Sequence, residues 1–246
     1  FTLINKKFLK QLIFYSLGLI LKIFPIFSIF IFIEKKKNLI IVLSFSIFYL
    51  LLMREEIALI KNNVIEYALI FAYGALSISK AIYFYSTKFN YFINEENYFI
   101  FKNLLSFVIG LLAAAVILLN FKFKRKKTHI NMPLKEKMFL SGAGIYIGTF
   151  IFSSNIDYRL IFLLFTIPFL LNQKNNKIIL LYLFSLIVCF NSLIIEGGDT
   201  YTLIYFFKAF FVYSLKLLMF IINCYFFGKI LSRYIDIGFF NPRSYY

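Results

Sequence analysis

Apolar and polar stretches alternate along the whole chain. The apolar stretches are near bilayer length or somewhat shorter, and none shows the alternating ten-residue pattern of a transmembrane β-barrel. In lipid, a helix satisfies its own backbone hydrogen bonds, so the pattern predicts a helix bundle. The stretches are Leu12–Ile33, Leu39–Met53, Val64–Tyr85, Leu104–Phe121, Phe139–Phe152, Leu160–Leu171, Ile178–Ile195 and about Leu203–Leu231. We therefore expect an all-α, polytopic transmembrane bundle of about eight spans, within a range of seven to nine.

Composition agrees with this pattern. Hydrophobic residues make up 61% of the chain and charged residues only 15%, with a mean hydropathy of +0.82, whereas a soluble domain carries roughly a quarter charged residues. The net charge of +16 comes from Lys and Arg gathered in short loops, which is typical of orientation by loop charge rather than of nucleic-acid binding. The lipid bilayer is therefore an expected partner, and nucleic acid is not.

Loop charge also predicts an orientation. The densest basic run, Phe121–Lys127, should face the cytoplasm. Alternation then places the polar segments Ser86–Tyr98, Asn155–Arg159 and Glu196–Thr200 on the opposite side of the membrane. The basic loop Glu34–Lys37 is an exception to the rule, because alternation places it outside as well.

Domain organisation is simple. No repeat of fixed period and no Pro- or Gly-rich linker divides the chain, so residues 1–246 are expected to form a single transmembrane domain. The first residue is Phe1 rather than Met, and we expect an N-terminal part to be missing. Cys189 and Cys224 both fall within apolar stretches and have no partner at metal-ligand spacing, so inert thiols and no metal site or other cofactor are expected.

The polar tip Asn155-Ile156-Asp157-Tyr158-Arg159 is the leading candidate site. As helices, the 14 residues of Phe139–Phe152 and the 12 residues of Leu160–Leu171 would reach only about 21 Å and 18 Å, whereas the hydrocarbon core is about 30 Å thick. The tip should therefore lie near or below the headgroups, where charges are costly. Arg159 can then act as a planar fork for a phosphate or carboxylate. Alternatively, Asp157 and Arg159 form a local ion pair that closes a helix hairpin, with Asn155 or Asp157 as a cap.

A second acidic turn should lie on the same side as the tip. Gly197-Gly198 permits an unusual backbone path between Glu196 and Asp199. Two carboxylates there could activate a hydroxyl or hold a divalent cation. The alternative is a polar turn between two helices, and no Asp-x-Asp spacing supports a dedicated metal site.

Two lysines interrupt the last apolar stretch. Lys208 and Lys216 are eight residues apart, which places them on one side of a helix with Lys216 about 12 Å deeper. Lysines within a membrane mark a substrate pathway or a paired carboxylate, although long stems can also reach the interface. We include Lys208 in the candidate site and leave both interpretations open for Lys216.

The segment around the tip resembles a known family. Tyr146, Thr149 and Phe150, followed by the string from Asn155 to Phe165 and then Pro168, resemble bacterial multi-pass glycosyltransferase-like proteins of the C-type superfamily, over about 30 of the 246 residues. The resemblance implies an inner-membrane protein that uses polyprenyl-phosphate sugars on the extracytoplasmic side. It also implies a carboxylate base in an early outer loop, but the first such loop here offers only Glu34, so the catalytic base stays unassigned.

The functional expectation follows from the tip and the resemblance together. We expect transfer of a sugar from a polyprenyl-phosphate donor to an extracytoplasmic glycan or lipid acceptor, as in cell-envelope polysaccharide biosynthesis. The expected substrate-binding residues are Asn155, Asp157, Tyr158, Arg159, Glu196, Asp199 and Lys208. Two other classes stay open, a transporter or flippase for an anionic or lipid-linked substrate and a polysaccharide polymerase or ligase.

Overall fold

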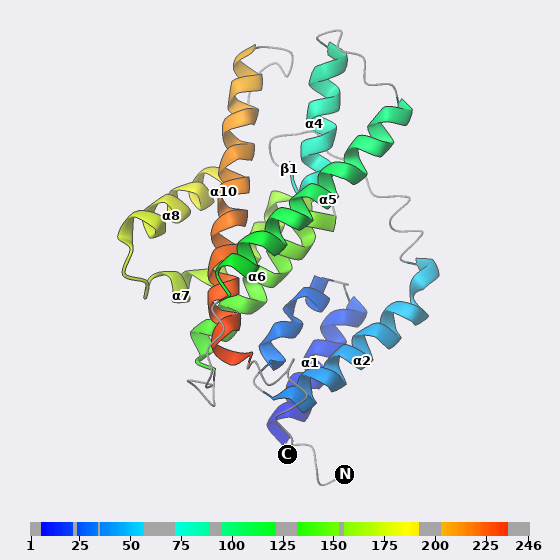
Figure 1. Cartoon of the computed structure of the whole chain (residues 1–246), viewed down its shortest axis with the longest axis vertical. Coiled ribbons are helices and arrows are strands. Elements are labelled where there is room, and N and C mark those ends of the chain that lie inside the picture. The colour runs from blue at the N-terminus through cyan, green and yellow to red at the C-terminus, as the bar shows by residue number, and fades with distance from the viewer. Residues whose placement is uncertain are drawn as a thin grey trace.

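The computed structural model describes residues 6–21, 24–33, 35–56, 72–88, 95–121, 132–152, 155–191 and 203–235. Nearly all of these residues are helical, which confirms the all-α class. In chain order, the elements of Figure 1 are α1 (Lys6–Leu21), η1 (Phe24–Phe32), α2 (Lys36–Leu52), β1 (Ala72–Tyr73), α4 (Ala75–Lys88), α5 (Glu95–Leu119), α6 (Leu134–Phe152), β2 (Asn155–Ile156), η2 (Asp157–Thr166), α7 (Ile167–Leu170), α8 (Asn176–Phe190) and α10 (Leu203–Tyr234).

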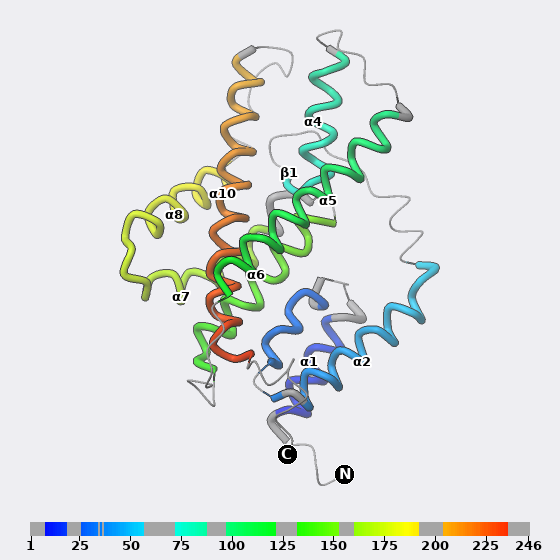
Figure 2. The backbone as a smooth tube through the Cα atoms, viewed as in Figure 1, coloured from blue at the N-terminus to red at the C-terminus, as the bar shows by residue number. Residues whose placement is uncertain are grey.

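The long helix α10 is the axis of the molecule. Its 32 residues span about 48 Å, more than the thickness of a bilayer core. Helices α5, α6 and α8 all pack against it, and the tube in Figure 2 shows α10 running most of the length of the fold.

Helix α6 forms the centre of the core. Its residues from Gly142 to Phe150 are all buried. A Cβ atom on Gly142 would overlap the carbonyl oxygen of Phe162, and one on Gly144 would overlap that of Phe27. Glycine at these two positions therefore lets η2 and η1 approach the α6 backbone directly.

The N-terminal elements have a cluster of their own. Phe8, Tyr15, Ile29, Phe32 and Val42 pack together across α1, η1 and α2. In Figure 1 these elements are the blue group at the lower right. Because η1 also packs along α6, this group is joined to the main core.

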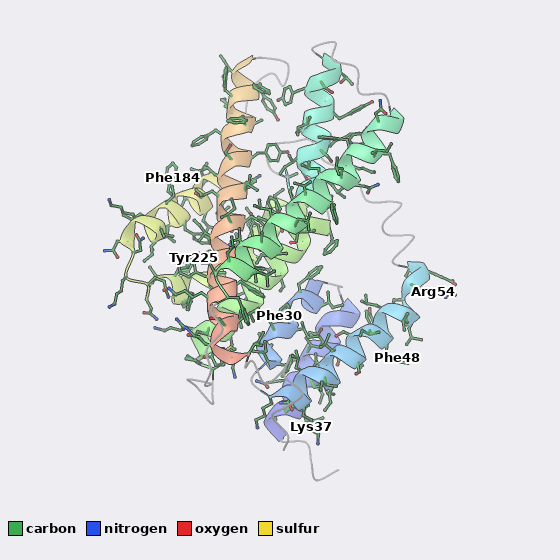
Figure 3. All side chains as sticks on the ribbon, in the orientation of Figure 1. Phe30, Lys37, Phe48, Arg54, Phe184 and Tyr225 are labelled. Carbon is green, nitrogen blue, oxygen red and sulfur yellow. The ribbon has the colours of Figure 1, made fainter. Side chains whose placement is uncertain are left out.

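Large apolar side chains cover much of the outer surface. Phe48 on α2, Phe107 on α5, Phe184 on α8 and Phe210 on α10 are each more than half exposed, and Figure 3 shows Phe48 and Phe184 pointing away from the bundle. So many exposed apolar side chains suit contact with lipid and not with water.

Two of the described helices are long and apolar enough to cross a membrane: α5 over Asn97–Leu119 and α10 over Ile204–Tyr234. This is evidence from length and composition alone. The helices Lys37–Leu52, Leu160–Leu170 and Asn176–Phe190 are apolar but shorter. The expectation of about eight spans is therefore not confirmed.

Two predicted spans are not single helices. In the stretch Leu12–Ile33, α1 ends at Leu21 and a 3-10 helix begins at Phe24, because Pro25 lacks an N–H and disfavours α conformation in the residue before it. In the stretch Val64–Tyr85, residues 72–73 form a strand and α4 begins only at Ala75. Gly74 makes this bend with φ of 111°, a conformation that favours glycine.

Candidate functional site: a strand pair beside Lys216

The polar tip is held by a partner segment far away in the sequence. Asn155 and Ile156 form β2, which pairs antiparallel with β1, so that Asn155 lies opposite Tyr73 and Ile156 opposite Ala72. The 3-10 helix η2 starts directly afterwards at Asp157. The tip is therefore not a simple turn between two α-helices, and the expected helix Leu160–Leu171 is mostly 3-10 helix followed by the short α7. We call β1 and β2 together the strand pair.

Lys216 lies directly against the strand pair. This residue is fully buried, and its Nζ atom donates a hydrogen bond of 2.9 Å to the carbonyl oxygen of Ala72. Its ammonium also lies 5.6 Å from the centre of the Tyr213 ring, a favourable cation–π distance. A buried ammonium carries a large desolvation cost, so its place beside the tip makes it a functional candidate.

Three residues of α6 build the wall of this site. The Tyr146 hydroxyl donates a hydrogen bond of 3.0 Å to the carbonyl oxygen of Lys216. Thr149 lies 3.4 Å from the Tyr73 hydroxyl, oxygen to oxygen, and Phe150 stacks on Phe220 of α10 with ring centres 4.5 Å apart. These contacts fix α6, α10 and β1 relative to one another around the Lys216 ammonium.

The other predicted site residues are placed only in part. The structure describes the backbone of residues 155–159 and not the side chains of Asn155, Asp157, Tyr158 and Arg159. Glu196 and Asp199 lie outside the described residues. Lys208 is partly buried on α10, eight residues from Lys216 on the side of the helix N-terminus.

Lys216 is the site residue that the sequence pattern did not single out. Its spacing from Lys208 indicated a shared helix side, but spacing alone does not say which lysine is buried deepest. A lysine in the middle of a long apolar stretch was the available signal. Tyr73 is a second missed residue, because it falls in a stretch that the hydrophobic pattern assigned to a continuous helix.

A second buried polar cluster links α8, η2 and α10. Tyr182 of α8 lies 2.8 Å from Thr166 of η2, oxygen to oxygen. Asn223 of α10 donates to Tyr182 over 3.2 Å and to the carbonyl oxygen of Met219 over 2.8 Å. Since each of these three side chains is fully buried, the cluster fixes α8 and η2 to α10.

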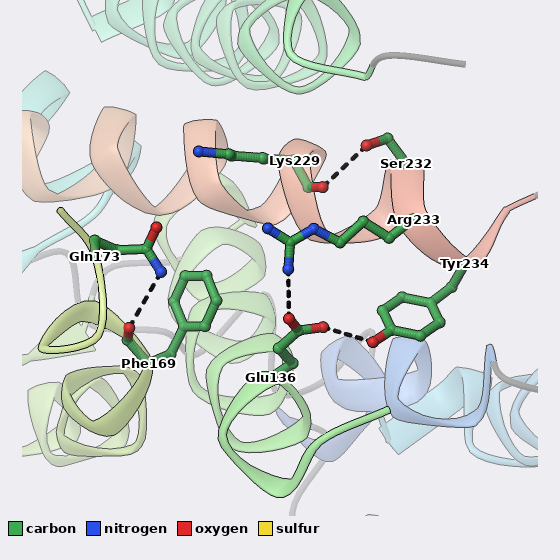
Figure 4. Close-up of polar contacts among 7 residues, drawn as sticks. All are labelled: Glu136, Phe169, Gln173, Lys229, Ser232, Arg233 and Tyr234. Carbon is green, nitrogen blue, oxygen red and sulfur yellow. Dashed lines mark hydrogen bonds and ion pairs between the residues drawn. The ribbon is translucent and has the colours of Figure 1, made fainter. Parts of the chain in front are cut away.

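A third polar cluster joins the start of α6 to the end of α10, as Figure 4 shows. One carboxylate oxygen of Glu136 accepts a hydrogen bond of 2.5 Å from Arg233, and the other accepts one of 2.7 Å from Tyr234. Glu136 is buried, whereas the Arg233 side chain is partly exposed. Each carboxylate oxygen thus has a partner on α10, and Glu136 acts as a structural clamp between the two helices.

Metal binding finds no support in the described ranges. His, Cys, Asp and Glu side chains there form no group of three that could hold a metal ion. Cys189 and Cys224 are both buried.

Comparisons of the chain with protein-family models, with curated proteins and with solved structures find no match. The site must therefore be interpreted from its own geometry.

Proposed function

We propose that this chain is a multi-pass membrane glycosyltransferase-like protein of the bacterial inner membrane. It moves a sugar from a polyprenyl-phosphate donor to an extracytoplasmic glycan or lipid acceptor. The observation that carries the proposal is the hydrogen bond from buried Lys216 to Ala72, the strand partner of Ile156, because it places an ammonium beside the polar tip. The proposed substrate-binding residues are Asn155, Asp157, Tyr158, Arg159, Glu196, Asp199 and Lys208.

A lipid-linked phosphate suits this arrangement chemically. It brings a negative charge to the edge of the hydrocarbon core, where a buried ammonium and a guanidinium interact with it strongly. Arg159 follows Ile156 by three residues, and its planar fork can bind two phosphate oxygens at once. Lys216 supplies a fixed positive charge that needs no rearrangement during the reaction.

The reaction needs no further reactant. The acceptor hydroxyl oxygen attacks C1 of the sugar and forms the new glycosidic bond while the bond from C1 to the phosphate oxygen breaks. Polyprenyl phosphate leaves with that electron pair, and the positive side chains stabilise its growing charge. The hydroxyl proton goes to a carboxylate, for which Asp157, Glu196 and Asp199 are the candidates.

The direct test uses the purified chain in vesicles. Polyprenyl-phosphate hexoses with a radiolabelled sugar serve as donors, and a bacterial envelope lipid and glycan extract serves as acceptor. We expect transfer of label to the acceptor, its loss in Arg159→Ala and its retention in Arg54→Ala. Arg54 is a matched control because it is an exposed arginine paired with exposed Glu55; Figure 3 shows it beside the end of α2.

Two results would contradict the proposal. One is equal transfer by the Arg159→Ala and Arg54→Ala variants. The other is movement of intact labelled donor across the vesicle membrane with no transfer to any acceptor, which would identify a carrier instead.

A further inference from the structure

An apolar groove runs between α4 and α10. Its volume is about 540 Å³, and its walls are almost entirely apolar. Ile78, Ala81 and Ile82 form part of the α4 side, and Ala209, Phe210 and Leu217 part of the α10 side. The groove is partly open to the outside, so a ligand can enter it from the surrounding medium.

The polar residues along the groove do not change its apolar character. The Ser86 hydroxyl donates to the carbonyl oxygen of Tyr83, and the Ser214 hydroxyl donates to that of Phe210. Each serine is thus satisfied by its own helix. The expected occupant is therefore a hydrocarbon chain, because water gains nothing from such walls.

The length of the groove matches one leaflet of a bilayer. It extends from Ile78 to Ser86 on α4, about 12 Å along that helix, and from Phe206 to Leu217 on α10, about 16 Å. Half of a hydrocarbon core about 30 Å thick is about 15 Å. Because α10 is long enough to cross the membrane, a groove in its first half lies within a single leaflet.

One polar atom at the groove has no assigned use. Tyr85 lines the groove, and its hydroxyl is buried without a hydrogen-bond partner among the described residues. A buried hydroxyl left unpaired costs free energy. Tyr85 lies three residues before the end of α4, the level at which the ester groups of a phospholipid would lie if α4 ends at the membrane surface.

We propose that this groove binds one acyl chain of a phospholipid from the extracytoplasmic leaflet. An ester carbonyl of that lipid accepts a hydrogen bond from the Tyr85 hydroxyl. The volume supports a phospholipid chain over a polyprenyl chain, because about 540 Å³ is the size of a site for a small molecule and a bacterial polyprenyl chain is several times larger. The proposal shares the membrane placement of the proposed function and does not depend on sugar transfer.

The chain contains no tryptophan, so a single Trp is a unique fluorescent probe. In Phe210→Trp the probe lies in the groove. In Phe107→Trp it lies on the similarly exposed surface of α5, away from the groove. Each full-length variant is titrated with brominated phosphatidylglycerol in mild detergent micelles, without any sugar donor. We expect saturable quenching near one lipid per protein for Phe210→Trp and only a gradual, non-saturable decrease for Phe107→Trp.

Two further variants test where the acyl chain of the lipid binds. Adding Ala209→Leu to Phe210→Trp fills the groove and should remove the saturable phase, whereas Tyr85→Phe should weaken binding about fivefold, the value of one net hydrogen bond. Unbrominated phosphatidylglycerol should restore the fluorescence.

The proposal is overturned if quenching at the two Trp positions is equally gradual, if the saturable phase survives Ala209→Leu, or if polyprenyl phosphate restores the fluorescence and phosphatidylglycerol does not. Unchanged affinity in Tyr85→Phe overturns the assignment of the ester carbonyl. Because no sugar donor is present, failure of this test leaves the transfer assay unaffected.

Discussion

The ammonium of Lys216 lies 2.9 Å from the carbonyl oxygen of Ala72, although 144 positions separate the two residues in the chain. This contact joins the middle of α10 to the strand that holds the tip. Ala72 pairs with Ile156, the residue directly before η2. The contact therefore places a positive charge close to the start of η2. The first prediction concerns that charge.

Replacing Lys216 by Met should remove sugar transfer while keeping the fold. Methionine has a similar shape and no charge, so the core stays filled and the desolvation cost of the ammonium disappears. Loss of one preorganised charge typically lowers the rate about 100- to 1,000-fold. The vesicle transfer assay measures the rate. Lys229→Met on the same helix is the control, because Lys229 is partly exposed and remote from the strand pair.

The buried cysteines provide a stability assay for every variant. Cys189 and Cys224 are both buried, so a dye that fluoresces on reaction with a thiol reports unfolding in detergent. For Lys216→Met we expect an unfolding midpoint within a few degrees of the wild type. A large drop together with lost activity would mean that Lys216 acts only on the fold.

A second prediction tests the close approach of α6 and η2. In Gly142→Ala the new Cβ would overlap the Phe162 carbonyl oxygen, a backbone atom that cannot swing away. We expect a loss of about 1–3 kcal/mol in the free energy of unfolding, as for other overpacked cores.

Gly110→Ala is the matched control for this change. It is also a helical glycine, but its new Cβ would lie 3.7 Å from Ile151 Cγ2, an ordinary contact. The gain in helix propensity should make it neutral or stabilising by up to about 1 kcal/mol. Equal behaviour of the two alanine variants would argue against the tight packing of α6 on η2.

A third prediction concerns the clamp between α6 and α10. Glu136→Gln keeps the size of the side chain but removes the charge that binds Arg233 and Tyr234. We expect a loss of about 2 kcal/mol in the free energy of unfolding, in the range of hydrogen bonds to charged groups. Glu55→Gln, which alters an exposed pair with Arg54, should change stability by less than about 1 kcal/mol. The thiol-dye assay compares the unfolding midpoints of the two variants. An unchanged midpoint in Glu136→Gln would show that Glu136 does not stabilise the contact between α6 and α10.

A fourth prediction concerns the buried cluster at Tyr182. Tyr182→Phe removes the hydroxyl that connects Thr166 to Asn223. The Thr166 hydroxyl and the Asn223 amide then stay buried with fewer hydrogen bonds. We expect a loss of about 1–3 kcal/mol in the free energy of unfolding. Tyr49→Phe on α2 is the control, because Tyr49 is only partly buried. If the two variants unfold at the same temperature, the cluster does not hold α8 and η2 to α10.

The hydrophobic pattern predicted the helical class and the long helix α10, whereas α5 begins at Glu95, nine residues before the predicted Leu104. A long apolar run indicates α10 even though Lys208 and Lys216 interrupt it, since a run of this length in lipid is best satisfied by a helix.

Other features depend on contacts that a pattern does not contain. The pairing of β1 with β2 joins residues more than 80 positions apart, and nothing in Ala72 or Tyr73 marks them as strand residues within an apolar stretch. Pro25 and Gly74 were visible in the sequence, but whether such residues bend or end a helix is decided by the surrounding packing. The burial of Lys216 likewise depends on how α10 is rotated against α6, which tertiary contacts such as those of Tyr146 and Phe220 fix.

The central claim is that the Lys216 ammonium and the tip together form a site for a lipid-linked phosphate. The most direct measurement is the dissociation constant of the full chain for polyprenyl phosphate and for the matching polyprenol, in the wild type and in Lys216→Met. Our account predicts that the wild type binds the phosphate at least tenfold more tightly than the alcohol and that Lys216→Met loses most of this preference. Equal affinity of the wild type for the two lipids would contradict it.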